Sequence, residues 1–179
     1  MARKLSMLTY RLASKADIEN IVTLVESAYR GESSRQGWTT EADFIKGQRT
    51  DYDEVATLMN ASNNAFLLCE SGGRLLASVH LCKLGNKACL GMFAVEPSGQ
   101  GQGTGKALLL QAEHYAVRQW HCVAMLMTVI SIRSELIHWY LRQGYMKTGK
   151  FKAFPYEEPR YGIPLRHDLV LETLEKKFR

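Results

Sequence analysis

Four glycines are concentrated in the short stretch EPSGQGQGTGK, which separates a strand-like segment, LGMFAV, from a helix-like segment that begins ALLL. A glycine-rich turn that leads into a helix leaves backbone N–H groups unpaired, and the helix dipole adds about half a positive charge at the same place. Because glycine has no Cβ, an anion can approach this backbone closely. The glycines Gly99, Gly101, Gly103 and Gly105 therefore predict a site that binds phosphate groups.

Two common nucleotide-binding motifs do not fit this stretch. A Walker A loop requires Gly where Gln100 stands and Ser or Thr where Ala107 follows the lysine. The dinucleotide fingerprint G-x-G-x-x-G also fails, because its last glycine falls at Thr104 or at Lys106, depending on where the count starts. The phosphate ligand is therefore expected to belong to another class.

The spacing that the stretch does satisfy is Gln100-x-x-Gly103-x-Gly105, directly after a strand that ends Val95-Glu96-Pro97. This arrangement resembles the loop [RQ]-x-x-G-x-[GA], with which acetyltransferases of the GNAT superfamily bind the pyrophosphate of acyl-CoA. A glycine-rich connector without a ligand is the alternative interpretation. The strand before the loop and the helix after it favour acyl-CoA.

A second segment, from Arg133 to Tyr145, is similar to another GNAT signature, roughly N-x-x-A-x-x-x-Y-x-x-x-G-F. Tyr140, Gly144 and Tyr145 match its spacing. Arg133 replaces the usual Asn, and Leu136 replaces the usual Ala. The Asn position commonly touches the cofactor in this family, so the resemblance suggests that Arg133 contacts a phosphate group or the acceptor.

The resemblance implies transfer of an acetyl group from acetyl-CoA to a primary amine, expected to be that of a small molecule, by direct attack in a ternary complex. Backbone N–H groups of residues 101–106 would bind the pyrophosphate. The strand end at 93–95 would pair with the pantetheine arm, and the N–H of Phe93 would face the acetyl oxygen. The cofactor-binding residues implied in this way are Phe93, Ala94, Val95, Gln100, Gly101, Gln102, Gly103, Thr104, Gly105, Lys106 and Arg133.

One catalytic residue follows from the resemblance. Tyr140 takes the place of a helix tyrosine that lies near the sulfur and can protonate the departing thiolate; the alternative is a tyrosine that packs in the core. The attacking amine must also be neutral, and a general base would help. Histone-type members carry a Glu four residues before the position of Phe93, but Cys89 stands there, and a thiol is a poor substitute. The base is left open among Glu32, Glu41, His80, Glu96 and His138.

Members of the family usually shape the acceptor pocket from the segment between the first two helices and from the loop between the last two strands. In this chain those segments are residues 32–41 and 154–164, and both mix aromatic side chains with charges of both signs. The substrate-binding residues expected here are Glu32, Arg35, Trp38, Glu41 and Tyr161. Such surroundings suit a small amphoteric acceptor, for example an amino acid or a polyamine derivative; solvated surface loops are the alternative.

The elements that position these residues follow from the hydrophobic periodicity. Apolar residues at helical spacing predict an amphipathic helix from Ile18 to Tyr29, which Gly31 ends. Further helices are predicted over 40–47, 51–59, 106–120 and from Ser131 or Ser134 to Gly144, and strands over 9–13, 65–70, 75–84, 88–95, 122–129, 145–151 and 165–172. Tight turns join the second to fourth strands into an antiparallel meander.

This order predicts an α/β (α+β) fold with a mixed, largely antiparallel central sheet and helices on both faces, in a single domain over residues 1–179. The GNAT fold has the same order, so the resemblance extends from about Thr9 to Glu172.

Composition narrows the function classes. The net charge is +5, but the basic residues are scattered, which disfavours a nucleic-acid partner. No apolar run is long enough for a signal peptide or a membrane span. The four cysteines, at 69, 82, 89 and 122, are expected to be buried thiols in a reducing cytoplasm, without a metal. A homodimer, a protein N-acetyltransferase and a non-catalytic acyl-CoA-binding or regulatory domain are kept as alternatives.

Overall fold

A seven-stranded mixed sheet forms the centre of the computed structural model, which describes residues 7–179. Residues 1–6 lie outside the described part of the structure. The expectation that this segment is not a signal peptide, and its place in the predicted domain, are therefore not tested there. The strand order is β1-β3-β4-β5-β6-β9-β7, and among these pairs only β5 and β6 run parallel. The strands are β1 (Thr9–Leu12), β3 (Asn64–Ser71), β4 (Arg74–Leu84), β5 (Lys87–Val95), β6 (Ala124–Ile130), β7 (Met146–Ala153) and β9 (Val170–Lys177). The predicted mixed, mostly antiparallel sheet is confirmed.

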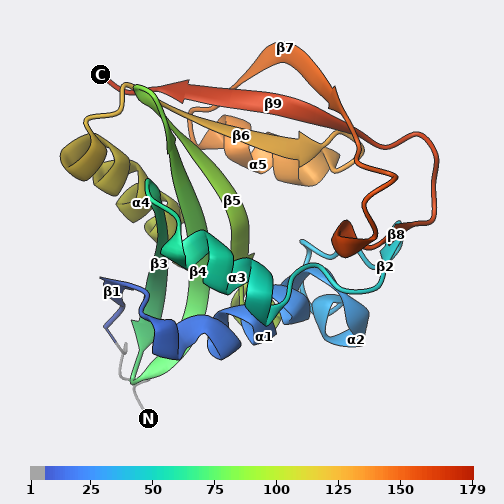
Figure 1. The fold of residues 1–179 in the computed structure, drawn as a ribbon, viewed down its shortest axis with the longest axis horizontal. Helices are drawn as coiled ribbons and strands as arrows, with labels where there is room; N and C mark the ends of the chain where they lie inside the picture. The colour runs from blue at the N-terminus through green and yellow to red at the C-terminus, as the bar shows by residue number, and fades with distance from the viewer. Residues whose placement is uncertain (1–6) are drawn as a thin grey trace.

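Helices cover both faces of this sheet (Figure 1). They are η1 (Lys15–Asp17), α1 (Ile18–Tyr29), α2 (Gly31–Ser34), α3 (Tyr52–Asn60), η2 (Pro97–Gly99), α4 (Thr104–Trp120), α5 (Ser134–Arg142) and η3 (Pro159–Tyr161). On one face, α1 and α3 bury an apolar cluster that includes Val25, Val55 and Leu68. On the other, α4 and α5 bury a second cluster that includes Leu108 and Ile137. The sheet therefore separates two apolar cores.

A β-bulge in β5 changes which face each side chain meets. Up to Leu90, the even-numbered residues of β5 pack in the core under α4, whereas Met92 and Ala94 pack in the core under α1. The register against β4 shifts between Ser78 and His80, and Met92 adopts a left-handed backbone with φ +42°. One extra residue in β5 accounts for this change of alternation.

From Leu90 onward, just before the bulge, β5 and β6 diverge (Figure 1). Their parallel pairing covers only Lys87–Cys89 on β5, opposite Ala124–Leu126 on β6. From there to Ile130, β6 stays paired with β9 alone. The second half of β5 therefore presents an open edge toward β6, in the middle of the sheet.

Two predicted elements were wrong. Residues 40–47 form turns and strand β2 (Ile45–Lys46), which pairs with β8 (Ile163–Pro164), instead of a helix. The Thr40 hydroxyl accepts from the backbone N–H of Ala42 and meets Ser34 Oγ at 2.6 Å, so Thr40 makes a local turn, and the long-range pairing with β8 holds Ile45 and Lys46 extended. The last strand covers 170–177 instead of 165–172, because the Arg166–Asp168 ion pair lies in a loop before it.

The cysteines also differ from expectation. Cys82 and Cys89 are opposite neighbours in the β4–β5 hairpin and form a disulfide, with Cα atoms 5.1 Å apart. The hairpin turn brings them together although their spacing is not C-x-x-C. Cys69 and Cys122 are buried free thiols, as predicted. Within residues 7–179, no cluster of His, Cys, Asp and Glu is arranged to hold a metal ion, and no helix is long and apolar enough to cross a bilayer.

Candidate active site

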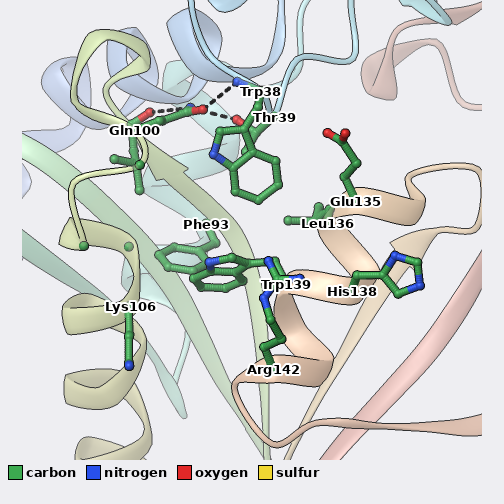
Figure 2. Close-up of a pocket in the computed structure, with 14 residues that line it drawn as sticks. Trp38, Thr39, Phe93, Gln100, Lys106, Glu135, Leu136, His138, Trp139 and Arg142 are labelled. Atoms are coloured by element: carbon green, nitrogen blue, oxygen red, sulfur yellow. Dashed lines mark hydrogen bonds between the residues drawn. The ribbon is translucent and has the colours of Figure 1, made fainter.

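A cavity of about 620 Å³ lies between the glycine-rich loop and α5 (Figure 2). The end of β5 forms its floor, the start of α4 one wall, and the loop after α2 its upper rim. Its lining residues are Trp38, Thr39, Phe93, Val95, Gln100, Gly101, Gly103, Gly105, Lys106, Glu135, Leu136, His138, Trp139 and Arg142. We call it the donor cavity.

The glycine-rich loop has the backbone of an anion site. Gly101 and Gly103 adopt left-handed conformations, with φ +80° and +88°, and a Cβ on either would meet nothing within 4 Å, so the space above the backbone is open. The first α4 hydrogen bond runs from the N–H of Ala107 to the carbonyl of Gly103. The preceding N–H groups of the first helical turn have no partner within the helix and carry its positive dipole end. This geometry fits a phosphate group.

The Gln100 side chain links the loop to two other segments. Its Oε1 accepts from the backbone N–H of Trp38 at 2.9 Å, and its Nε2 donates to Thr39 Oγ1 at 2.8 Å and to the Val95 carbonyl at 3.1 Å (Figure 2). At Gly37, a Cβ would come within 2.4 Å of Oε1, so only glycine fits there without a shift. Gln100 therefore fixes the rim of the donor cavity to its floor.

Aromatic side chains form the apolar part of the donor cavity. The ring of Trp139 lies 6.1 Å from that of Phe93 and 6.4 Å from that of Trp38, measured between centroids. Gly105 faces the same space, because a Cβ there would lie 3.3 Å from Val95 Cγ2 and 3.9 Å from the Trp139 ring. The arrangement leaves a narrow apolar groove that leads from the glycine loop to β5.

A second cavity, of about 450 Å³, occupies the space where β5 and β6 diverge. We call it the acceptor cavity. It shares Phe93 and Leu136 with the donor cavity, so the two meet at the β5 bulge. Its lining includes the ends of α1 and β7, the loop around β2 and most of the second half of β6. The charged residues among these are Arg30, Glu41, Arg49, Arg133, Lys152 and Glu158.

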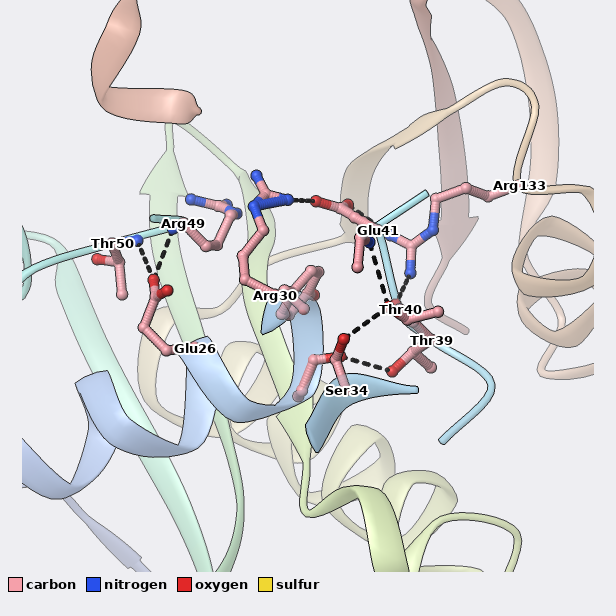
Figure 3. Close-up of polar contacts among 12 residues, drawn as sticks. Glu26, Arg30, Ser34, Thr39, Thr40, Glu41, Arg49, Thr50 and Arg133 are labelled. Atoms are coloured by element: carbon pink, nitrogen blue, oxygen red, sulfur yellow. Dashed lines mark hydrogen bonds and ion pairs between the residues drawn. The ribbon is translucent and has the colours of Figure 1, made fainter. Parts of the chain in front are cut away.

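A buried charge cluster forms one wall of the acceptor cavity (Figure 3). Glu41 Oε2 accepts from Arg30 Nη1 at 2.6 Å, and Glu41 Oε1 accepts from Arg133 Nη1 at 2.9 Å. Arg133 also donates from Nη2 to the carbonyl of Thr39 at 2.5 Å. The side chains of all three charged residues are less than a tenth exposed. Both oxygens of Glu41 are thus engaged.

Tyr29 connects this cluster to the bulge. Its hydroxyl donates to the carbonyl of Phe93 at 2.8 Å, and the guanidinium carbons of Arg49 and Arg133 lie 5.7 and 5.6 Å from its ring centroid. Burial raises the pKa of the Tyr29 hydroxyl. The phenol therefore stays protonated and holds the Phe93 peptide in place, while its ring supports two cations.

Tyr140 lies on α5 and packs in the apolar core that α4 and α5 cover. It is 4% exposed, and its ring packs edge-on against Trp139 and Tyr145, at 5.0 and 5.7 Å. Burial raises its pKa strongly, with a further increase from Tyr29 and an opposing effect of Arg133. Tyr140 is not among the residues that line either cavity. Gly144, with φ +92°, ends α5 as predicted.

The other sequence-predicted residues are distributed as follows. Of the predicted cofactor residues, Ala94 is buried in the α1-side core, Thr104 is buried, Gln102 is exposed, and Arg133 lines the acceptor cavity instead of the donor cavity. Of the predicted substrate residues, Glu41 lines the acceptor cavity, Trp38 lines the donor cavity, and Glu32 and Arg35 pair on the surface. Tyr161 ends η3, and its side chain lies outside the described part of the structure.

The base candidates also separate. His138 lines the donor cavity, Glu96 pairs with Arg74, and neither cavity includes His80. His80 stacks on Phe66, its Nε2 lies 2.7 Å from Asn64 Oδ1, and burial lowers its pKa to about 4.

The site residues that the sequence analysis missed include Tyr29, Arg30, Arg49 and Trp139. Tyr29 was assigned only to the apolar side of a helix. Arg30 and Arg49 lie just outside regular elements, where no periodicity or motif marks them. Only the tertiary fold brings these residues together.

Comparisons with known proteins agree with this geometry. The profile of the acetyltransferase (GNAT) family matches residues 23–145. The ribosomal-protein-S18-alanine N-acetyltransferase from Escherichia coli is 14% identical over 96% of this chain and 94% of its own, with a TM-score of 0.71. The spermidine/spermine N-acetyltransferase from Vibrio cholerae is 14% identical over 95% and 92%, with a TM-score of 0.66. An N-acetyltransferase from Staphylococcus aureus is 13% identical over 96% and 98%, with a TM-score of 0.72. No curated protein matches by sequence.

At these identities, the solved structures establish the fold alone. The family profile goes further, because it covers more than half of the chain and includes both segments on which the resemblance was based. The predicted resemblance is confirmed. The chain belongs to the acetyltransferase (GNAT) family of enzymes.

Proposed function

We propose that this protein transfers the acetyl group of acetyl-CoA to the primary amine of a small molecule, by direct attack in a ternary complex. One observation carries the proposal: two cavities meet at Phe93 and Leu136, where β5 and β6 diverge. A donor bound in one cavity and an acceptor bound in the other would bring their reacting atoms together at this point.

The donor cavity fits acetyl-CoA. The open backbone above Gly101 and Gly103, together with the N-terminus of α4, would hold the pyrophosphate, and Lys106 adds a positive charge nearby. The groove between Phe93 and Trp139 would hold the apolar part of the pantetheine arm. Acetyl-CoA supplies an activated thioester, and the protein's contribution is to hold it at the bulge.

Two groups of this chain would then serve the reaction. The backbone N–H of Phe93 would stabilise negative charge on the acetyl oxygen, a contribution of a few kcal/mol for a well-placed donor. Tyr140 would give its proton to the departing thiolate. Its raised pKa keeps it protonated, which a general acid requires.

Deprotonation of the amine has no dedicated carboxylate in this proposal. Among the carboxylates that line the acceptor cavity, Glu41 is held by two arginines and Glu158 is about half exposed at the rim. We infer that the amine binds in its neutral form and loses its second proton to water after attack. The rate should therefore rise with pH until the free amine is largely neutral.

The acceptor cavity also bears on the alternatives. Its volume, about 450 Å³, and its buried charged wall favour a small acceptor over a protein. Relatives differ in this respect: the Escherichia coli neighbour is named for a ribosomal protein and the Vibrio cholerae neighbour for spermidine and spermine. The fold alone therefore does not select the acceptor.

The test is thiol release from acetyl-CoA across a panel of primary amines, with mass spectrometry of the acetylated products. We expect one thiol for each acetylated amine. Gly105→Val serves as the control, because its added side chain fills the donor groove. Tight binding of acetyl-CoA without thiol release for any amine or peptide would favour the non-catalytic acyl-CoA-binding alternative.

A further inference from the structure

The wall of the acceptor cavity carries more positive than negative charge. Arg30, Arg49 and Arg133 contribute three positive charges, and Glu41 is the one carboxylate that contacts two of them (Figure 3). Glu26 lies behind the wall, where its Oε1 accepts from the backbone N–H groups of Arg49 and Thr50 at 2.6 and 2.7 Å. With both carboxylates counted, one positive charge is left over.

Lys152 and Glu158, which also line the cavity, are exposed and of opposite sign. They leave the balance of the buried wall unchanged.

Arg49 carries this excess charge most directly. Within residues 7–179, its guanidinium has neither a hydrogen-bond partner nor an ion-pair partner, and its Nη1 is buried from solvent. Its one described side-chain interaction is with the face of the Tyr29 ring. A guanidinium has five N–H donors, and a buried donor without an acceptor costs free energy. The side chain is therefore held ready for an acceptor that the protein does not supply.

The excess positive charge also affects the neighbouring arginines. Burial lowers the pKa of the Arg30 guanidinium; Glu41 opposes this, and the charge of Arg49 lowers it further. Arg133 donates one N–H to Glu41 and one to the Thr39 carbonyl, and its side chain lines the cavity. A single negative charge in the cavity would balance the wall.

A cationic acceptor meets the opposite situation. A polyamine that presents one neutral amine for attack still carries further ammonium groups. Those charges would lie against a wall that already holds an excess of positive charge with little water to screen it. The acceptor cavity therefore selects against the polyamines and in favour of an amine with an acidic group.

We propose that the acceptor is a small amino acid-like molecule, whose carboxylate or similar acidic group binds Arg49 while its amine points toward Phe93. Guanidinium groups bind carboxylates with two parallel hydrogen bonds, which fixes the direction of the ligand. The anion site then orients the amine toward the meeting point of the cavities. This inference rests on the proposed acetyl transfer and narrows its acceptor.

Matched acceptors test the charge requirement. L-methionine and L-phenylalanine are compared with their α-amides, which lack the carboxylate, and with spermidine, at saturating acetyl-CoA. Rates are corrected for the neutral fraction of each amine, because amidation lowers the pKa of the amine. We expect kcat/KM to be at least tenfold higher for each amino acid than for its amide. For spermidine we expect a kcat/KM below those of the amides. A preference for an amide or for spermidine overturns the proposal, while thiol release with either still supports acetyl transfer.

Variants of Arg49 test the residue. Removal of this side chain breaks no hydrogen bond to a described residue, so Arg49→Gln should fold. We expect it to lower kcat/KM at least tenfold for the amino acids and less than twofold for the amides, with partial recovery in Arg49→Lys. Arg166→Gln, on an exposed arginine that lines neither cavity, is the matched control and should change neither. An equal loss for amino acids and amides would make Arg49 merely structural.

Binding of a product separates the two proposals if no amine turns over. Calorimetry with N-acetyl-L-methionine and with its amide measures the anion site without chemistry. Binding of the acid alone, lost in Arg49→Gln, supports the anion site even where acetyl transfer has failed. Equal binding of acid and amide contradicts it.

Discussion

The donor and acceptor cavities are formed by different parts of the chain: the first mainly by backbone and the second mainly by side chains. The donor cavity depends on backbone: left-handed glycines, the first turn of α4 and the end of β5. The acceptor cavity depends on charged side chains that come from two separate stretches of the chain, around residues 30–41 and at Arg133, and meet around Glu41. Backbone geometry demands particular residues at fixed spacing, whereas a side-chain cluster does not. The first kind of site can therefore be recognised in a sequence, and the second cannot.

The largest effect is expected at the acceptor wall. Glu41→Gln keeps the shape of the side chain but leaves two buried guanidinium groups without their shared carboxylate. We expect a loss of about 3 kcal/mol or more in the free energy of unfolding, measured by urea denaturation. Glu32→Gln is the control, because Glu32 pairs with an arginine on the surface and is 93% exposed. An equal free energy of unfolding for both variants would mean that the buried charge cluster contributes little to the stability of the protein.

The next effect concerns the proposed general acid. Tyr140→Phe removes one hydroxyl and keeps the ring packing on Trp139 and Tyr145, so the melting temperature should change little. Loss of a general acid typically lowers rates by about 10²–10⁴-fold, and we expect the lower end of this range. The loss should appear in kcat and in kcat/KM alike. Activity within about twofold of the parent at several pH values would return Tyr140 to a packing role.

A smaller effect is expected in the donor cavity. Gly105→Val places two methyl groups in the groove beside Val95 and Trp139, and we expect affinity for acetyl-CoA to fall about tenfold, or about 1.4 kcal/mol. Gly105 suits this test better than Gly103, since Gly103 has a left-handed backbone that valine would strain. Gly99→Ala is the control: its Cβ meets open space and its φ is not positive. Calorimetry of both folded variants decides whether the groove holds the cofactor.

The smallest effect tests which of the two cavities Trp38 serves. Trp38 was expected on the acceptor side, yet its side chain lines the donor cavity near Trp139. With 38% of its surface exposed, it contributes only part of a wall. We expect Trp38→Ala to weaken acetyl-CoA binding a few fold and to leave the acceptor KM unchanged. The opposite pattern in steady-state kinetics would show that the segment after α2 serves the acceptor.

The sequence predicted the elements whose cause is local. The period of α1, the tight turns of the meander and the glycine loop each follow from neighbouring residues. The short strand β2 did not follow, because Ile45 and Lys46 pair with Pro164 and Ile163 of β8, far away in the sequence. The Cys82–Cys89 disulfide needed the register of the hairpin, and the partners of Glu41 needed the tertiary fold. Long-range contacts decide what local pattern leaves open.

The bulge in β5 reverses the alternation of side chains between the two faces of the sheet at Met92. Upstream, even positions belong to the core under α4; downstream, they belong to the core under α1. Deletion of one residue at Met92 would restore a regular strand and turn Phe93 and Val95 away from the donor cavity. An insertion of one residue two or three positions later would restore the position of the glycine loop, but the Phe93 side chain would still point away from the donor cavity. The junction of the two cavities is therefore a point at which sequence length, and not only sequence identity, is constrained.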